Sequence, residues 1–262
     1  MLIDGYSHCG ISKYRPVEDV LAVMHSAGIG RAVLCQHLGE YDNSYLAGVV
    51  ARFPETLAAV CLVDPTSATA IADLERWHAT GAFRGVRLYA GWLDEYVHLW
   101  SRAVELGMTL VIYASEGAGF AAPPVERFMT AYPTARLVMT HLGNPIIRDG
   151  RPVETELLRL AAHRGVYVQL SGLSMFCPYP HAELNALVRA VVREGPLVVS
   201  PGPDEGKHLL GRAQLLLDAG EVEAALADVD AAIAAGLEAA ATRPAANLGA
   251  YCLAVLDRRD RL

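Results

Sequence analysis

The sequence predicts an α/β protein folded as a (β/α)8 TIM barrel, on the strength of three observations. Short apolar runs alternate with longer amphipathic segments along most of the chain, which is the pattern of repeated strand–helix units. The strand-like runs are apolar on both faces, as expected where helices cover a parallel sheet. A length of 262 residues suits one such barrel. We therefore predict a single domain over residues 1–262, with extra helices at its C-terminal end.

Eight short apolar runs are the expected strands of the barrel. In chain order they are Leu2–His8, Arg31–His37, Leu57–Asp64, Phe83–Ala90, Thr109–Ser115, Arg136–Gly143, Val166–Leu173 and Pro196–Ser200. A longer amphipathic segment follows each of them, as the barrel requires. These expected helices are Val17–Ala27, Asn43–Phe53, Ala68–Thr80, Glu95–Leu106, Pro124–Tyr132, Val153–His163, His181–Arg193 and Lys207–Ala219. Two alanine-rich segments, Val222–Ala235 and Leu237–Ala246, are expected to form a packing helix pair.

Composition excludes several classes of partner. Hydrophobic residues make up 53% and charged residues 19% of the chain, so a large core can be buried. The net charge is −7 and no basic cluster interrupts it, which argues against nucleic acid and anionic membranes as partners. No apolar run is long enough to span a membrane. A small-molecule substrate remains as the expected partner, and a homo-oligomer is compatible with the sequence.

The cysteines and the start of the chain suggest a cytoplasmic protein. The five cysteines are an odd number without metal-like spacing, so we expect reduced thiols in or near the core. Met1 leads directly into a strand-like run, so no signal peptide is expected.

Polar residues gather at the ends of the predicted strands, where a TIM barrel places its active site. Residues two apart on a strand share a face, so these side chains are expected to converge at one mouth. The candidates are Tyr6 and His8 on strand 1, Gln36 or His37 on strand 2, Arg87 and Tyr89 on strand 4, Tyr113, Ser115 and Glu116 at strand 5, His141 on strand 6, Gln169 and Ser171 on strand 7, and Asp204 after strand 8.

Several fragments, in order and at barrel spacing, resemble the amidohydrolase superfamily. Residues 3–8 resemble its opening Asp-x-His-x-His strand, and residues 141–145 and 166–173 resemble its sixth and seventh strands. Residues 243–248 resemble its usual ending. The likeness is greatest to the amidohydrolase-2 branch and its lactonase-like group, which includes sugar-lactone hydrolases and pyrone-dicarboxylate lactonase. The resemblance implies a barrel hydrolase with its site at the mouth.

The chain departs from the family pattern at the metal ligands. The first opening histidine is replaced by Tyr6, while His8 matches the second. The strand-5 histidine position holds Tyr113, and His141 matches the strand-6 histidine. The strand-8 aspartate, which in the family usually activates water, is replaced by Pro201. These departures put ordinary metal-dependent hydrolysis in doubt.

We therefore expect no metal and no other cofactor. A catalytic zinc takes about three protein ligands, whereas only His8 and His141 remain at matched positions. A neutral tyrosine is a poor ligand because its pKa lies near 10. A metal site rewired through Glu116 or Asp204 is an alternative.

The remaining groups suit acid–base chemistry on a small oxygenated, cyclic or carbonyl-bearing molecule. His8 and His141 are expected to transfer protons near neutral pH, and Tyr6 and Tyr113 to stabilise negative charge. Arg87 is expected to hold a carboxylate or another planar acceptor. Further substrate contacts are expected from Tyr89, His37, Glu116, Ser171 and Asp204.

The type of reaction stays open at this point. Lactone hydrolysis competes with isomerisation, cyclisation, dehydration and decarboxylation. A catalytically inactive barrel that serves as a binding protein is a further alternative.

Overall fold

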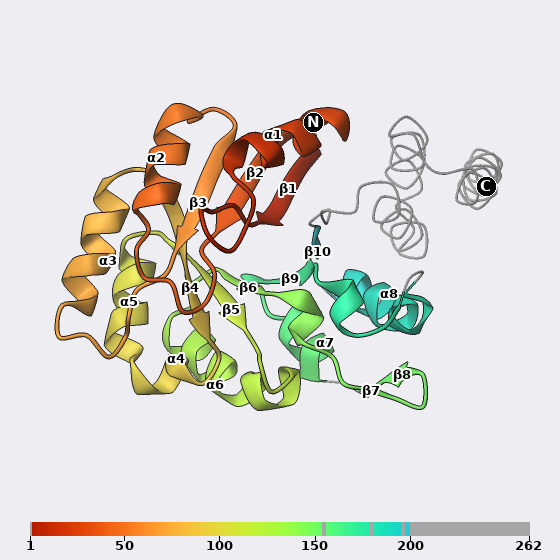
Figure 1. Ribbon diagram of the computed structural model, residues 1–262. Helices are drawn as coiled ribbons and strands as arrows, with labels where there is room; N and C mark the ends of the chain where they lie inside the picture. The colour runs from red at the N-terminus through yellow and green to blue at the C-terminus, as the bar shows by residue number, and fades with distance from the viewer. Residues whose placement is uncertain (1, 154–155, 179–180, 195–196, 200–262) are drawn as a thin grey trace, which may run out of the picture.

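A computed structural model describes residues 2–153, 156–178, 181–194 and 197–199. Eight parallel strands form one sheet in the order β1-β2-β3-β4-β5-β6-β9-β10, and its two end strands, β1 and β10, lie against each other (Figure 1). The strands are β1 (Leu2–Ser7), β2 (Ile29–Cys35), β3 (Leu57–Cys61), β4 (Phe83–Tyr89), β5 (Thr109–Tyr113), β6 (Leu137–Met139), β9 (Val166–Leu170) and β10 (Leu197–Val199). The predicted TIM barrel is confirmed.

Helices follow the strands and cover the outside of the sheet (Figure 1). They are α1 (Val17–Ser26), α2 (Ser44–Arg52), α3 (Ala70–Ala79), α4 (Trp92–Glu95), α5 (Val97–Glu105), α6 (Ala118–Ala131), α7 (Glu156–Ala161) and α8 (Asn185–Glu194). None of the helices in the described ranges is long and apolar enough to cross a membrane. The helices expected at 207–219, 222–235 and 237–246 lie outside the described residues, as do Pro201 and Asp204.

The structure differs from the expected elements at several places. The helix expected at residues 95–106 is divided into α4 and α5, because Tyr96 leaves helical geometry with φ −119° and ψ 40°. Helix α6 begins six residues before Pro124, so it includes both Pro123 and Pro124. A short antiparallel hairpin, β7 (Ile147–Arg148) with β8 (Arg151–Pro152), occupies the connection before α7. These boundaries depend on loop packing, which the alternation of apolar and polar residues does not encode.

Strand 6 also ends earlier than expected, and the reason lies in the backbone. Residues 141–144 all have positive φ, with values of 55° at His141, 53° at Leu142, 66° at Gly143 and 60° at Asn144. A left-handed backbone costs a non-glycine residue roughly 1–2 kcal/mol and cannot continue a strand. Strained backbone of this kind concentrates at functional sites, and His141 is a candidate site residue.

Among the described residues, two separate apolar clusters contribute to the core. The larger one lies between the strands and the helices and includes the fully buried Trp100 and Phe83. The smaller one combines Tyr6, Cys35, Val60 and Val111, with Val33 and Val138 packed against it. Neighbouring strands pair Cys35 with Val60 and Val111 with Val138, so the smaller cluster fills the interior of the barrel. Tyr6 belongs to this cluster and is also a candidate site residue.

Four of the five cysteines lie in the described part of the chain: Cys9, Cys35, Cys61 and Cys177. All four are buried and free of disulfides, as expected for reduced core thiols. Cys252 lies outside it.

Gly85 lets β4 approach β5 inside the barrel. A Cβ atom at this position would lie 2.6 Å from the backbone oxygen of Thr109, which cannot move without disturbing the sheet. We expect Gly85→Ala to lower the free energy of unfolding by about 2 kcal/mol or more, measured by urea denaturation.

The matched control is Gly48→Ala on the exposed face of α2, where an added Cβ meets nothing within 4 Å. Alanine there should leave stability unchanged or raise it by about 1 kcal/mol. Equal unfolding midpoints for the Gly85→Ala variant and the wild type would contradict the role of this glycine.

Candidate active site

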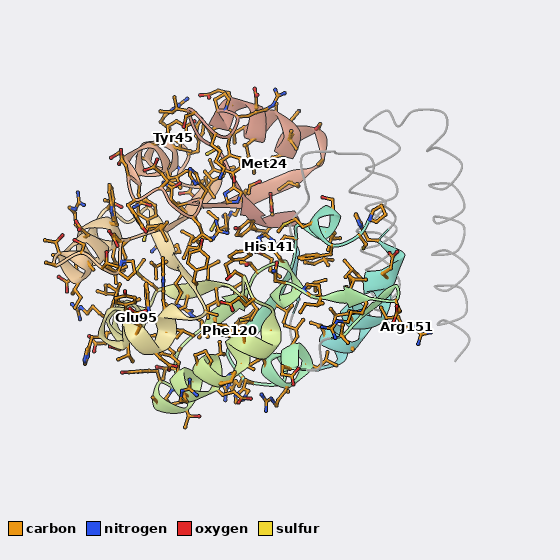
Figure 2. The ribbon with its side chains drawn as sticks, turned by 60° about the horizontal axis from the view of Figure 1, so that its bottom comes forward. Met24, Tyr45, Glu95, Phe120, His141 and Arg151 are labelled. Atoms are coloured by element: carbon orange, nitrogen blue, oxygen red, sulfur yellow. The ribbon has the colours of Figure 1, made fainter. Side chains whose placement is uncertain are left out.

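Five of the predicted site residues converge at the C-terminal mouth of the barrel. The Tyr6 ring lies 4.9 Å from the His8 ring and 5.3 Å from the His141 ring, measured between centroids. The Tyr113 ring lies 5.8 Å from that of His141. The guanidinium carbon of Arg87 lies 5.5 Å from the Tyr6 centroid and 5.9 Å from that of Tyr113. Figure 2 shows His141 near the middle of the ribbon, enclosed by the surrounding helices.

Arg87 is a buried cation without an ion-pair partner among the described residues. Its side chain is 5% exposed, and β4 pairs it with Val111 of β5. One Nη1 proton is donated to the backbone oxygen of Gln36 at 2.9 Å. Its Nε is buried and makes no hydrogen bond within the described structure. None of the ion pairs found there includes Arg87. A buried guanidinium of this kind is suited to an anionic ligand.

A chain of hydrogen bonds fixes the tautomer of His141. The backbone oxygen of Gly5 only accepts, so the Nε2 group of Gln169 must donate to it, at 3.2 Å. The Oε1 of Gln169 then accepts the hydroxyl proton of Ser171 at 2.9 Å. The Ser171 oxygen is left to accept from Nδ1–H of His141 at 2.8 Å. Nε2 of His141 therefore carries no proton while the ring is neutral.

The same argument applies to His8. Its Nδ1 lies 2.6 Å from the backbone oxygen of Cys35, which only accepts, so Nδ1 carries the proton. The ring is also held by stacking on Tyr14, with centroids 4.5 Å apart and planes 14° from parallel. Both imidazoles thus have a fixed orientation, and the unprotonated Nε2 of each makes no hydrogen bond within the described residues.

Burial and the Arg87 charge keep both imidazoles neutral. Burial, followed by repulsion from the Arg87 guanidinium, lowers the pKa of His8 to about 3 and the pKa of His141 to about 4. The expectation that these histidines titrate near neutrality is therefore wrong for the free protein. At pH 7 both rings are neutral and can act as bases. Neither can act as a general acid until its Nε2 has first taken up a proton.

The tyrosines divide into two groups. The Tyr6 hydroxyl is buried inside the barrel, where Tyr6 packs with Cys35, and burial raises its pKa far above the usual range. Tyr6 therefore offers the site its ring, and its hydroxyl is out of reach of a substrate oxygen. Tyr89 and Tyr113 are half-buried at the ends of β4 and β5, where the two residues pair directly. They are the tyrosines placed to meet a ligand.

The remaining predicted residues lie at different distances from this centre. Ser171 belongs to it through His141, and His37 lies beside it, its ring 5.6 Å from that of Tyr14. Glu116 is exposed, and no contact joins it to the five central residues. Asp204 is outside the described residues.

The contributions of Tyr14 and Trp92 were missed at the sequence level. Tyr14 follows β1 by seven residues, and Trp92 follows β4 by three residues. Tyr14 lies in the loop after β1 and Trp92 is the first residue of α4, and strand parity predicts neither position.

The described residues do not fit a metal ion. They contain no group of three or more His, Cys, Asp or Glu side chains arranged to hold one. The Tyr6 ring contacts both imidazoles, at the position where the resemblance implies a ligand. The Arg87 guanidinium beside them repels a second cation.

Comparison with known proteins finds amidohydrolases and a lactonase. A sequence model of the family described as amidohydrolase matches residues 10–244. An L-fucono-1,5-lactonase from Burkholderia ambifaria is 30% identical over 186 residues, which are 66% of this chain and 63% of that protein. This chain therefore spans less than two thirds of the length of that curated relative.

Two solved structures share the fold. A probable 2-pyrone-4,6-dicarboxylic acid hydrolase from Acinetobacter baumannii, with citric acid bound, superposes with a TM-score of 0.64 at 15% identity, covering 86% of this chain and 95% of that one. A Burkholderia multivorans amidohydrolase with bound HEPES gives a TM-score of 0.63 at 15% identity, covering 97% and 99%. The same B. multivorans protein has also been solved with bound zinc.

The neutral imidazoles make stability depend on pH. In the unfolded chain each histidine binds a proton below about pH 6.5, while the folded protein resists protonation until about pH 3–4. The unfolded state thus binds more protons in this window, and the free energy of unfolding should fall as pH drops through it. The expected loss is about 2 kcal/mol per histidine between pH 8 and pH 5, measured by urea denaturation at each pH.

Replacing either histidine by asparagine should flatten this profile by about half. The exposed His25 is the control, since His25→Asn should leave the slope unchanged. A wild-type profile that is flat between pH 8 and 5 would contradict the buried neutral state.

Proposed function

Because this chain belongs to the amidohydrolase family, we propose that it is a barrel enzyme that works without a catalytic metal on a small cyclic or carbonyl-bearing carboxylate. The reaction that the family and the lactonase relative favour is lactone hydrolysis. The observation that carries the proposal is a pair of oriented imidazoles beside a buried guanidinium. Among the described residues, neither Nε2 atom makes a hydrogen bond and the guanidinium has no ion-pair partner.

In this mechanism Arg87 binds and orients the substrate. Its uncompensated charge attracts a carboxylate, or the carbonyl oxygen on which negative charge develops. The Tyr113 hydroxyl, on a half-buried ring 5.8 Å from the His141 ring, is placed to donate to the same developing charge. Binding an anion would also offset the repulsion that keeps the imidazoles neutral, so their pKa values would rise toward the range useful in catalysis.

His141 is the first choice for the proton-transfer group. Its free Nε2 takes a proton from the attacking water as the new C–O bond forms at the carbonyl carbon. When the ring C–O bond breaks, the imidazolium returns this proton to the leaving alkoxide. The Ser171 oxygen accepts from Nδ1–H throughout, so it stabilises the charged ring.

A second candidate reaction transfers a proton at carbon and needs no attacking water. Pro201 stands where the resemblance implies the water-activating aspartate. Isomerisation, dehydration or decarboxylation of a carboxylated ring would use the same guanidinium and imidazoles. Loss of turnover on every substrate class would favour the binding-protein alternative.

We expect His141→Asn to lower the turnover rate by about a hundred-fold or more. Asparagine can still donate to Ser171 but has no atom equivalent to the basic Nε2. The measurement is steady-state kinetics on a panel that contains L-fucono-1,5-lactone, 2-pyrone-4,6-dicarboxylate and unsaturated ring acids. His8→Asn tests the second imidazole in the same way, and the exposed His98→Asn is the control. Near wild-type rates for both folded variants would refute the acid–base role.

We also expect the purified full-length protein to hold well under one equivalent of zinc or manganese per chain. Elemental analysis measures this content, and turnover before and after dialysis against a chelator measures the dependence on it. About one equivalent of metal, with activity lost on chelation and restored by metal, would establish the rewired metal hydrolase instead.

A further inference from the structure

The short hairpin β7–β8 projects from the mouth side of the barrel. It lies in the connection that follows the carboxyl end of β6, and Figure 1 shows it extending beyond α7 at the edge of the molecule. Arg148 and Arg151 pair across its two strands, and Asp149 and Gly150 form its turn, both with positive φ. Ile147 packs against the larger core cluster, so the base of the hairpin is anchored on the barrel.

The outward face of the hairpin combines two aliphatic side chains with two cations. Residues two apart on a strand share a face, so Ile146 lies on the same face as Arg148, and Val153 on the same face as Arg151. The N–H of Val153 donates to the Ile146 oxygen at 3.0 Å, so these two residues are direct neighbours. Ile146 is 45% and Val153 is 52% exposed, and both arginines are exposed. We call these four residues the hairpin face.

The hairpin face has no partner among the described residues. Like charges directly opposite each other on paired strands are destabilising. Neither Arg148 nor Arg151 belongs to an ion pair in the described ranges. The two aliphatic side chains beside them leave apolar surface in water, which costs free energy. A surface that offers carboxylates next to an apolar side chain would offset both costs.

The loop after β2 offers these complementary groups. Tyr41 is 40% exposed and lies between Glu40 and Asp42, which are both exposed. No ion pair of the described structure includes either carboxylate. Their hydrogen bonds come from the same loop and the start of α2: Glu40 accepts from the N–H of Asp42, and Asp42 accepts from Ser44. We call residues 40–42 the acidic loop.

The hairpin face and the acidic loop lie on opposite sides of the barrel mouth. β2 is the second strand and β6 the sixth in a ring of eight, so the connections after them are half a turn apart. Figure 2 shows this separation, with Tyr45 of α2 and Arg151 on opposite sides of His141. One chain therefore cannot bring the two surfaces together. A two-fold axis that relates two copies mouth to mouth can place each hairpin on the acidic loop of the other copy, so that the contact forms twice.

We propose that the protein forms a two-fold homodimer in which the hairpin face of each copy docks on the acidic loop of the other. The two arginines pair with the two carboxylates of the partner's loop, and the two aliphatic side chains pack against its tyrosine. A second copy is favoured over an unrelated acidic protein because one chain carries both halves of the contact. The two mouths then face each other, and the contacts flank both candidate active sites.

Charge reversal in the full-length protein tests this dimer. One variant is Arg148→Glu/Arg151→Glu and the other is Glu40→Lys/Asp42→Lys, and sedimentation equilibrium measures the dissociation constant of each. We expect the wild type to dimerise, and each variant alone to have a dissociation constant raised by about ten-fold or more, because both of its contacts join like charges. An equimolar mixture of the two variants should form a heterodimer, because both contacts then join opposite charges again.

The matched control is Arg31→Glu/Arg84→Glu, which changes the net charge as much as the hairpin variant does. Both arginines are exposed near the starts of β2 and β4, at the end of the barrel opposite the mouth. This variant should dimerise like the wild type. Circular dichroism checks that each variant is folded. If Asp42→Lys disturbs the loop, Glu40→Lys alone takes its place in the mixture.

A monomeric wild type would overturn the inference, and so would a dimer that survives reversal of the hairpin charges. Two folded, monomeric variants that stay monomeric when mixed would do the same, because the hairpin and the acidic loop would then not meet. None of these measurements depends on turnover, so their outcome is separate from that of the proposed function.

Discussion

The buried guanidinium of Arg87 is the constraint on which the rest of the site depends. A cation removed from water is costly unless other groups replace its solvation. Here one backbone oxygen and two aromatic rings do so, and no ion-pair partner is found in the described structure. Cation–π contacts of this kind contribute about 0.5–2 kcal/mol each. Burial and, after it, the remaining positive potential keep both imidazoles neutral. The same potential opposes a metal ion in this space.

Two backbone carbonyl oxygens fix the tautomers of the two histidines in the site. Because Gly5 O and Cys35 O can only accept hydrogen bonds, they determine which nitrogen of each histidine is protonated. The strained turn at residues 141–144 and the positive φ of Gly172 bring His141 onto Ser171. A Cβ atom on Gly172 would lie 2.8 Å from Nδ1 of His141, so this position also depends on glycine. His8 and His141 are thus oriented as bases by oxygen atoms of the backbone and of Ser171, and not by a carboxylate.

The Tyr6 side chain belongs both to the apolar interior of the barrel and to the candidate active site. Its ring packs with Cys35, Val60 and Val111 in the barrel interior and also contacts both imidazoles. The replacement of a family histidine by tyrosine therefore changes more than a ligand. It extends the apolar interior up to the mouth and occupies the space between the two histidines that remain.

The sequence by itself determined the strand order and the inward face of each strand, because period-two alternation and the strand–helix repeat are local patterns. From these two features follows the convergence of five side chains at the mouth: Tyr6, His8, Arg87, Tyr113 and His141. It could not determine tautomers or proton affinities, because these depend on Gly5 and Cys35 oxygens and on an arginine from other strands. Nor could it place Tyr14, in the loop after β1, or Trp92, at the start of the short helix α4, because strand periodicity does not extend to them. Only the tertiary structure decided that Tyr6 presents its ring, since burial against Cys35 turns its hydroxyl into the core.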